Sequence, residues 1–393
     1  MLLHEFRTLD FKIQVQDSLS DPTLIKKWKD MTLSARHLRP EMLFLLEKSK
    51  PLDLKFRYLY ITSLSNNEEL CGVVYLQQLK FNHRNFYFAK KNILHYFALL
   101  TLRFSSFKVL LAGCLFSVDF SPLAFNRNKI TPEDILKILD EYSKQEKYDI
   151  MVLKDMPDIF HKTMMHENGF DPFETDLTMQ LEINPRWKSL QDYEKALTHK
   201  YAQRVRKITK QGSSLQRREI SFDEFNTHRS RIKELFHQVS EKQTVRMGIV
   251  DDIYFEELFK ALGEDFKMTC YFLNEKMIAF SSHIFYPEKL EVHYIGIDYE
   301  YNSKYALYFN ILYDGITMAI EHSRKSLELG RTAREAKAVV GCHPIYFNDY
   351  LKVRSPLTKW LLDLLRNYFN KGIGEGWKKR HPFKTIASDI TVK

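Results

Sequence analysis

Glycine and proline are scarce in this chain, at 13 and 12 of 393 residues. Such low contents argue against a disordered chain and against an all-β fold, which needs many tight turns. Cysteine is scarcer still, and no two of the four residues have metal-ligand or redox-motif spacing. We therefore expect reduced thiols, no disulfide framework and no metal site at Cys71, Cys114, Cys270 and Cys342.

Long hydrophobic runs are also missing. The amino-terminal stretch MLLHEFRTLDFKIQ is interrupted by charges, which argues against a secretory signal. The most apolar window, 93–111, contains His95, Arg103 and Lys108, whereas a membrane-spanning helix needs about 20 apolar residues. The composition, 44% hydrophobic and 28% charged, instead predicts a cytoplasmic globular protein that is long enough for two domains.

Positive charge is concentrated in one segment. The formal net charge is +9, and residues 186–218 contain ten basic residues against Asp192 and Glu194, a local net charge of +8. The basic residues are Arg186, Lys188, Lys195, Lys200, Arg204, Arg206, Lys207, Lys210, Arg217 and Arg218. Such a stripe favours an anionic partner, although a solvated helix face is an equally ordinary explanation.

The first half of the chain alternates between extended and helical patterns, after about 50 residues with no clear pattern. The element order ββαβαβαβ predicts an α/β or α+β domain. Asn184-Pro185 marks its end, because the residue before a proline is disfavoured in a helix. We expect domains over 1–185 and 186–393. The expected elements are strands over 55–63 and 71–81, a helix over 91–102, a strand over 108–113, a helix over 131–146, a strand over 148–153, a helix over 159–167 and a strand over 177–183.

The second half begins with a basic helix near Trp187. Its apolar positions Tyr193, Leu197, Tyr201, Val205 and Ile208 recur every three or four residues, which predicts one anchored face. A β-meander, a long helix, a strand and a short helix follow, then a carboxy-terminal helical extension. Both halves contain a hairpin followed by helix and strand, so we expect two tandem copies of one fold. The remaining expected elements are helices over 222–238 and 252–262, strands over 267–273, 277–285 and 290–297, a helix over 305–322, a strand over 327–329 and a helix over 332–340.

Three segments carry a resemblance to a known family. The runs YIGIDYEYNSKYALYF (294–309), LGRTAREAK (329–337) and LTHKYAQRVRK (197–207) resemble the FemAB-like branch of the GNAT acyltransferase superfamily. The resemblance covers about 187–352, and the first half is similar in element order alone. It implies two tandem GNAT-like domains, each with a mixed sheet flanked by helices.

The resemblance also implies an activity. The chain is expected to move an acyl or aminoacyl group from acyl-CoA or aminoacyl-tRNA to an amine, with no permanently bound cofactor. The acceptor would be a small molecule or a cell-wall precursor held in the cleft between the domains. The basic helix, 192–211, would suit tRNA. The turn NSKYAL lacks the glycines that typical GNAT acetyltransferases place near the pyrophosphate, which leaves both donors open.

Candidate site residues follow from the same logic. In a GNAT-like site, backbone N–H groups of a splayed strand polarise the acyl carbonyl, and a helix N-terminus receives phosphate. Glu291 and His293 would help deprotonate the amine, with the backbone of Tyr294, Ile295 and Gly296 at the carbonyl. Asn302, Ser303 and Lys304 would form the phosphate-facing turn. Asp298 and Tyr299 end the strand, and Arg331, Arg334, Lys337 and Arg204 would hold the acceptor or donor.

Two other functions are compatible with the same residues. Without the loop glycines, the chain could be a catalytically degenerate module that binds RNA or another anionic ligand through its basic helix. Glu291 and His293 could also be ordinary strand residues, and His343-Pro344 is expected to be a turn. A stripe from Trp360 to Phe369 is compatible with peripheral contact with a membrane, although such a stripe more often packs on its own domain.

Overall fold

The computed structural model describes residues 2–51, 54–65, 69–82, 103, 106–173, 177–241, 250–356, 358–360, 362 and 378–384. The chain divides into two units, each of which includes more than one stretch of sequence. The first contains residues 1–176, 244–257 and 346–374, and the second contains 177–243, 258–345 and 375–393. Among the described residues, no helix is long and apolar enough to cross a bilayer. The four cysteines are buried and free.

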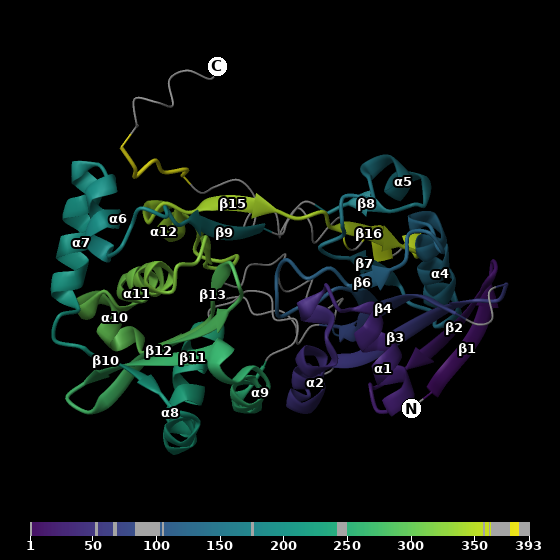
Figure 1. Ribbon diagram of the computed structural model, residues 1–393, viewed down its shortest axis with the longest axis horizontal. Coiled ribbons are helices and arrows are strands. Elements are labelled where there is room, and N and C mark those ends of the chain that lie inside the picture. Colours follow the sequence, from purple (N-terminus) through teal and green to yellow (C-terminus); the bar gives the residue numbers. More distant parts are fainter. Residues whose placement is uncertain are drawn as a thin grey trace. The chain divides into compact units, whose positions relative to one another are not determined.

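The first unit is built on a nine-stranded sheet with the order β1-β2-β3-β4-β5-β7-β16-β8, in which β6 pairs with β4 (Figure 1). A buried cluster that includes Ile13, Leu59, Leu76 and Leu139 forms its core. Its elements are β1 (Leu2–Thr8), β2 (Phe11–Gln16), α1 (Pro22–Met31), α2 (Pro40–Ser49), β3 (Leu54–Ser63), β4 (Leu70–Phe81), β5 (Phe107–Ala112), β6 (Leu123–Phe125), α4 (Pro132–Gln145), β7 (Ile150–Leu153), α5 (Lys162–Glu167), β8 (Asp171–Pro172) and β16 (Tyr350–Val353).

Local sequence explains the parts of this unit that were predicted. Thr131 caps α4, and the Asp134 carboxylate accepts from the Thr131 backbone N–H, so the two residues form a capping box. Alternation predicted the β3–β4 pair. The first 50 residues were left without a pattern, yet they contain the β1–β2 hairpin and two helices. The helix expected over 91–102 lies outside the described residues.

The predicted boundary after Pro185 differs from the division in the structure. The strand expected to end the first domain, β9 (Leu177–Glu182), pairs with β14 (Ser326–Glu328) in the second sheet. The first sheet instead receives β16, which pairs with β7 and β8 and follows almost all of the second unit in sequence. Strand pairing across such separations is decided by tertiary packing, which local patterns do not report.

Asp140 on α4 forms ion pairs with Lys352 of β16 and with Arg354, which follows the strand, and so helps to hold β16 in the first sheet. Its carboxylate lies 2.7 Å from the Lys352 Nζ and from an Arg354 guanidinium nitrogen, and 2.8 Å from the Lys144 Nζ. Burial would raise the pKa of Asp140, but hydrogen bonds from Lys144 and Lys352 and the charges of Lys352 and Arg354 lower it to about 2. The ionised carboxylate therefore stabilises the fold at neutral pH.

We expect Asp140→Asn to lower the free energy of unfolding by about 1–2 kcal/mol at pH 7, because two basic residues of β16 and its flank lose their counter-charge. The contribution is fully present above the unfolded pKa of about 4 and is lost as the pH falls toward 2. Urea unfolding at pH 7 and at pH 3 measures this. The matched control is Glu141→Gln on the neighbouring position, for which we expect less than about 0.5 kcal/mol. Equal effects of both variants at pH 7 would contradict the assignment.

The second unit is built on a seven-stranded sheet with the order β10-β11-β12-β13-β14-β9-β15. Figure 1 shows α11 and α8 on opposite sides of its β10–β13 part. Helix α9 (Asp252–Leu262) is divided between the units at Glu257. The other elements, besides β9 and β14, are α6 (Leu190–Ala196), α7 (His199–Gln211), β10 (Gln216–Ile220), α8 (Phe222–Ser240), β11 (Phe266–Leu273), β12 (Lys276–Phe285), β13 (Lys289–Ile297), α10 (Tyr299–Tyr305), α11 (Leu307–Glu321), α12 (Arg334–Val339) and β15 (His343–Tyr346).

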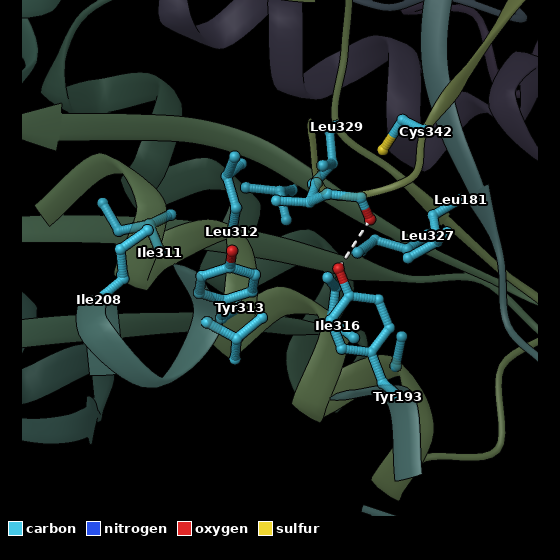
Figure 2. Packing of buried hydrophobic residues seen from close by; sticks show 14 of the residues in the cluster. Leu181, Tyr193, Ile208, Ile311, Leu312, Tyr313, Ile316, Leu327, Leu329 and Cys342 are labelled. Carbon is cyan, nitrogen blue, oxygen red and sulfur yellow. Dashed lines mark hydrogen bonds between the residues drawn. The ribbon is translucent and has the colours of Figure 1, made fainter. Parts of the chain in front are cut away.

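The meander, the helices and the anchored face of the basic helix agree with the sequence patterns. Tyr193, Val205 and Ile208 are buried in one cluster with α11. Figure 2 shows Tyr193 in this cluster, where its hydroxyl donates to the Val340 carbonyl over 2.9 Å. Three details differ: the basic helix breaks into α6 and α7, β10 and β15 were not predicted, and His343-Pro344 begins a strand rather than a turn. Most of the carboxy-terminal stripe lies outside the described residues.

Candidate functional site

Strands β13 and β14 separate near the middle of the second sheet. Their parallel pairing stops at Glu291 opposite Glu328, and within the described residues Val292 to Ile297 have no ladder partner on that side. β14 meanwhile stays paired with β9. The result is a gap in the sheet along the second half of β13, at the strand that the sequence analysis expected to splay.

A β-bulge shapes β13 at the start of this gap. His293 and Tyr294 together lie opposite Ser282 of β12. The Tyr294 backbone N–H donates to the Ser282 Oγ over 3.0 Å, and this hydroxyl donates to the Tyr294 carbonyl over 3.1 Å. Tyr294 was expected to offer its N–H to a ligand, but that N–H is engaged by a buried serine. The bulge changes the alternation of side chains by one position.

The N–H groups that can serve a ligand belong to the residues that follow the bulge. The Asp298 N–H donates to the Ile278 carbonyl over 2.8 Å, so these two residues form a hydrogen-bonded pair. Antiparallel pairs alternate, which turns the N–H groups of Ile297 and Ile295 away from β12 and toward the gap. The Ile295 N–H therefore faces the gap, and its role toward a donor stays a prediction.

Gly296 has a packing role. A Cβ at this position would come within 2.2 Å of the Phe280 ring and 2.8 Å of the Leu235 side chain on α8. Only glycine lets α8 pack this closely on the strand. Its predicted role in approaching a donor therefore has a structural alternative that accounts for the residue.

Glu291 and His293 form a buried pair where the gap begins. The His293 Nδ1 lies 2.5 Å from one Glu291 oxygen, and the Tyr286 hydroxyl donates to the other over 3.2 Å. Burial opposes ionisation of Glu291, but the charge and hydrogen bond of His293, with the charge of Lys289, hold its pKa below the ordinary value. The predicted base and orienter are thus in contact, and the pair can accept a proton.

The expected phosphate-facing turn is helical. Asn302, Ser303 and Lys304 lie in α10, and the chain breaks between α10 and α11 at Ala306, which has a φ of 48°. This left-handed conformation usually favours glycine. The Asn302 side chain accepts the Tyr308 N–H over 3.0 Å and so satisfies one free donor in the first turn of α11.

A pocket of about 460 Å³ opens beside this break. It lies at the end of β13, and α10, the start of α11 and α12 contribute small and aromatic side chains to its wall. Its lining residues are Ile297, Tyr299, Asn302, Ser303, Ala306, Tyr308, Phe309, Ala333 and Ala336. Ala333 is also left-handed, with a φ of 51°. Two of the left-handed non-glycine residues of the chain therefore lie in the wall of this pocket.

Lys337 on α12 is buried, contrary to the prediction that it reaches a substrate carboxylate or phosphate. Only 3% of it is exposed, and its Nζ donates to the Gly330 carbonyl over 3.1 Å. Burial lowers its pKa to about 7, and the charges of Arg334 and Arg331 act in the same direction. The cause is helical geometry: the side chain points back over the preceding turn, toward the end of β14. Arg331 and Arg334 are partly exposed at the start of α12.

Basic residues of α7 reach the edge of the pocket. Lys200, Arg204 and Lys207 are exposed and spaced by four and three positions, so they share one face. The Arg204 guanidinium carbon lies 4.6 Å from the ring centroid of Phe309, which lines the pocket. Lys304 is exposed, with its Nζ 5.1 Å from the Tyr305 ring centroid. We refer to Lys200, Arg204 and Lys207 as the α7 stripe.

Asp298 and Tyr299, at the end of β13, have different roles. One Asp298 oxygen accepts the Glu300 N–H at the start of α10, and the other accepts an Arg231 nitrogen over 2.6 Å. Asp298 thus fixes α10, whereas Tyr299 lines the pocket. Ser282 and the pocket alanines could not be found from the sequence, because small side chains carry no chemical signature. The residue types around Ala306 gave no signal for the break.

Comparisons with known proteins agree with this architecture. Among solved structures, a tandem GNAT protein from the clavulanic acid biosynthesis pathway, solved without AcCoA, has a TM-score of 0.51 at 10% identity and covers 88% of this chain and 99% of that chain. FemX gives 0.49 at 13% identity, with 81% and 93% covered. L-PGS from Bacillus licheniformis gives 0.48 at 11%, with 91% and 99% covered.

A search of curated proteins finds no match to this chain. A family model described as an acetyltransferase (GNAT) domain matches residues 199–338, which include β13, the break at Ala306 and most of α12. The chain therefore has the fold of tandem GNAT proteins, and its residues 199–338 match the model of the GNAT acetyltransferase domain.

Proposed function

We propose that the second unit transfers an acyl group from an activated donor to an amine. The observation that carries this proposal is the gap beside β13, which runs from the Glu291–His293 pair to the pocket at Ile297. A donor seated in the pocket can extend its acyl group into the gap. There the N–H groups of Ile295 and Ile297 point toward the place of the carbonyl oxygen, as an oxyanion-stabilising site requires.

The chemistry follows from these groups. The acceptor nitrogen attacks the acyl carbon, an N–C bond forms, and the C–S or C–O bond to the carrier breaks. The attacking amine must lose a proton, and the Glu291–His293 pair is placed to take it up. The carrier leaves as a thiolate or alkoxide, which takes up a proton.

Acyl-CoA is the donor we favour. The pocket volume is within the range of small-molecule sites, about 300–1,000 Å³. The segment between β13 and α11 lacks the glycines of typical GNAT acetyltransferases, but Ala306 adopts the left-handed backbone conformation that glycine usually supplies. The start of α11 and the Asn302 and Ser303 side chains at the pocket suit a phosphate group.

Aminoacyl-tRNA is the second candidate, and the α7 stripe favours it. Three exposed cations on one helix face lead to the pocket edge at Phe309, which suits a phosphate backbone. Binding to wild-type protein separates the candidates. A tRNA donor predicts affinity that falls steeply with salt and no affinity for acyl-CoA. Salt-dependent RNA binding without any transfer would instead support the non-catalytic binding module.

We expect Ala336→Trp to weaken acyl-CoA binding about tenfold or more, because the indole would fill space between α12 and α11. Isothermal titration calorimetry with acetyl-CoA, a longer acyl-CoA and CoA measures the effect. The matched control is Glu321→Trp at the exposed far end of α11, which should bind as the wild type does. Unchanged binding in Ala336→Trp would exclude the pocket as the donor site.

A further inference from the structure

A short carboxy-terminal segment, Lys378–Lys384, packs onto the second unit through one aromatic anchor. The Phe383 ring lies 5.8 Å from Trp187 in a stacked arrangement and 6.0 Å from Tyr193 edge-on, measured between ring centroids. A Cβ at Gly341 would come within 2.5 Å of this ring, and the φ of Gly341 is +97°. The slot for Phe383 therefore depends on a glycine two residues after the end of α12.

The same segment joins the junction of α6 and α7 to α12, which contributes to the wall of the pocket. At the start of α7, the Thr198 N–H donates to the Pro382 carbonyl over 2.8 Å, and the Lys384 N–H donates to the Ala196 carbonyl over 2.9 Å. On α12, Glu335 forms an ion pair with Arg380. Glu335 lies next to Ala336, a lining residue of the pocket.

The first turn of helix α12 has little to hold it in place by itself, because Arg334, Glu335 and Ala336 are outside the core. The helix has six residues, and its first position, after Ala333, has no side-chain cap. A helix this short is not stable alone, because forming the first turn is unfavourable and too few hydrogen bonds follow to offset that cost. It also carries the buried Lys337, whose charged form is disfavoured there. External contacts must therefore fix the position of this wall of the pocket.

We propose that Lys378–Lys384 is a strap that positions α12, so that donor affinity depends on the carboxy-terminal segment. The proposal rests on the pocket being the donor site, as stated above. The strap lies outside residues 199–338, so it is a feature of this chain beyond the matched domain. Arg380 and Phe383 act on the donor only through α12 and are positioning residues.

Charge reversal across the ion pair provides the test. Arg380→Glu and Glu335→Arg each place like charges together, whereas the double variant restores an ion pair with opposite polarity. Hydrogen–deuterium exchange of residues 334–339, without ligand, reports the position of α12. Each single variant should exchange faster there, and the double variant should return toward wild type. The matched control is Lys379→Glu, an exposed neighbour with the same change in charge.

Donor affinity is the second measurement, by calorimetry with acetyl-CoA. If a single variant leaves α12 in place in only about a tenth of molecules, its apparent affinity for acetyl-CoA falls about tenfold. The double variant should recover the wild-type affinity. Phe383→Ala should show the same two effects from the aromatic side of the strap. Unchanged exchange in Phe383→Ala and Arg380→Glu would overturn the strap. Faster exchange with unchanged donor affinity would overturn its link to the pocket.

The two proposals fail in different ways. If the wild type binds no acyl-CoA, the proposed donor is wrong, and the exchange of 334–339 still decides whether the strap holds α12. If the wild type binds acyl-CoA and all variants bind it equally, the donor site stands and the strap has no part in it.

Discussion

A Lys337→Met variant is expected to be more stable than the wild type at pH 7, by about 2–4 kcal/mol, and to lose most acyl transfer. The lysine is fully buried and its pKa is lowered to about 7 by desolvation. In the unfolded chain the pKa of lysine is about 10.4. Between pH 7 and 10.4, Lys337 is therefore protonated in the unfolded chain and mostly neutral in the folded one. Methionine fills similar space without the desolvation cost of the amine. Loss of the hydrogen bond to the Gly330 carbonyl reduces the gain in stability by about 1 kcal/mol.

The pH dependence has a defined sign. Because the folded-state pKa of Lys337 is lowered, its neutral form is favoured on folding, and wild-type stability rises as the pH increases from about 7 toward 10. The variant should lack this rise, so the two unfolding free energies converge at high pH. Chemical denaturation at pH 7 and pH 9.5 measures both. A variant that is less stable than wild type at pH 7 would contradict the assignment.

The loss of transfer has a separate reason. The Lys337 amine ionises near neutral pH, and Lys337 lies one helical turn after the pocket residue Ala333, so its amine is a candidate for handling protons close to the donor. We expect kcat to fall about 100-fold, within the range of groups that handle protons. Lys337→Arg is the matched control for stability, because a guanidinium cannot lose its charge and should destabilise. A stable Lys337→Met protein with full activity would exclude a role in transfer.

Glu291→Gln is expected to lower kcat about 100- to 1,000-fold with little change in KM for the donor. Glutamine keeps the size of the side chain but removes the negative charge that faces the His293 ring. Donor binding uses the pocket at the other end of the gap, so it should survive. Steady-state kinetics with a chosen amine acceptor separate kcat from KM.

The control for this variant is Glu300→Gln, an exposed glutamate on α10 near the pocket. We expect its kinetics to match the wild type. If Glu291→Gln instead raises KM for the donor with kcat unchanged, the pair belongs to donor binding and another group takes the proton.

Much of the second unit could be predicted from periodicity. The β11–β13 meander and the helices around it follow alternating and 3.6-residue patterns, and Glu291 with His293 was correctly placed on one strand. The break at Ala306 could not be predicted, because alanine has no preference for a φ of 48°. Tertiary packing imposes it.

Two further features depend on contacts that local sequence does not encode. The burial of Lys337 could not be predicted, since lysine is almost always exposed and only the position of α12 removes it from water. The places of β9 and β16 depend on pairing between residues that are far apart in sequence. The phosphate-facing turn was expected from its polar residues, which instead form the last turn of α10.

The place of β16 has a consequence for how the protein is made. Between β8, which ends at Pro172, and β16, which begins at Tyr350, the ribosome must produce about 180 residues. At 5–20 residues per second this takes roughly 10–35 seconds. Throughout that time β7 and β8 lack the strand that lies between them. The nascent first unit therefore exposes open strand edges during this time, which is a greater aggregation hazard than in a domain with contiguous strands.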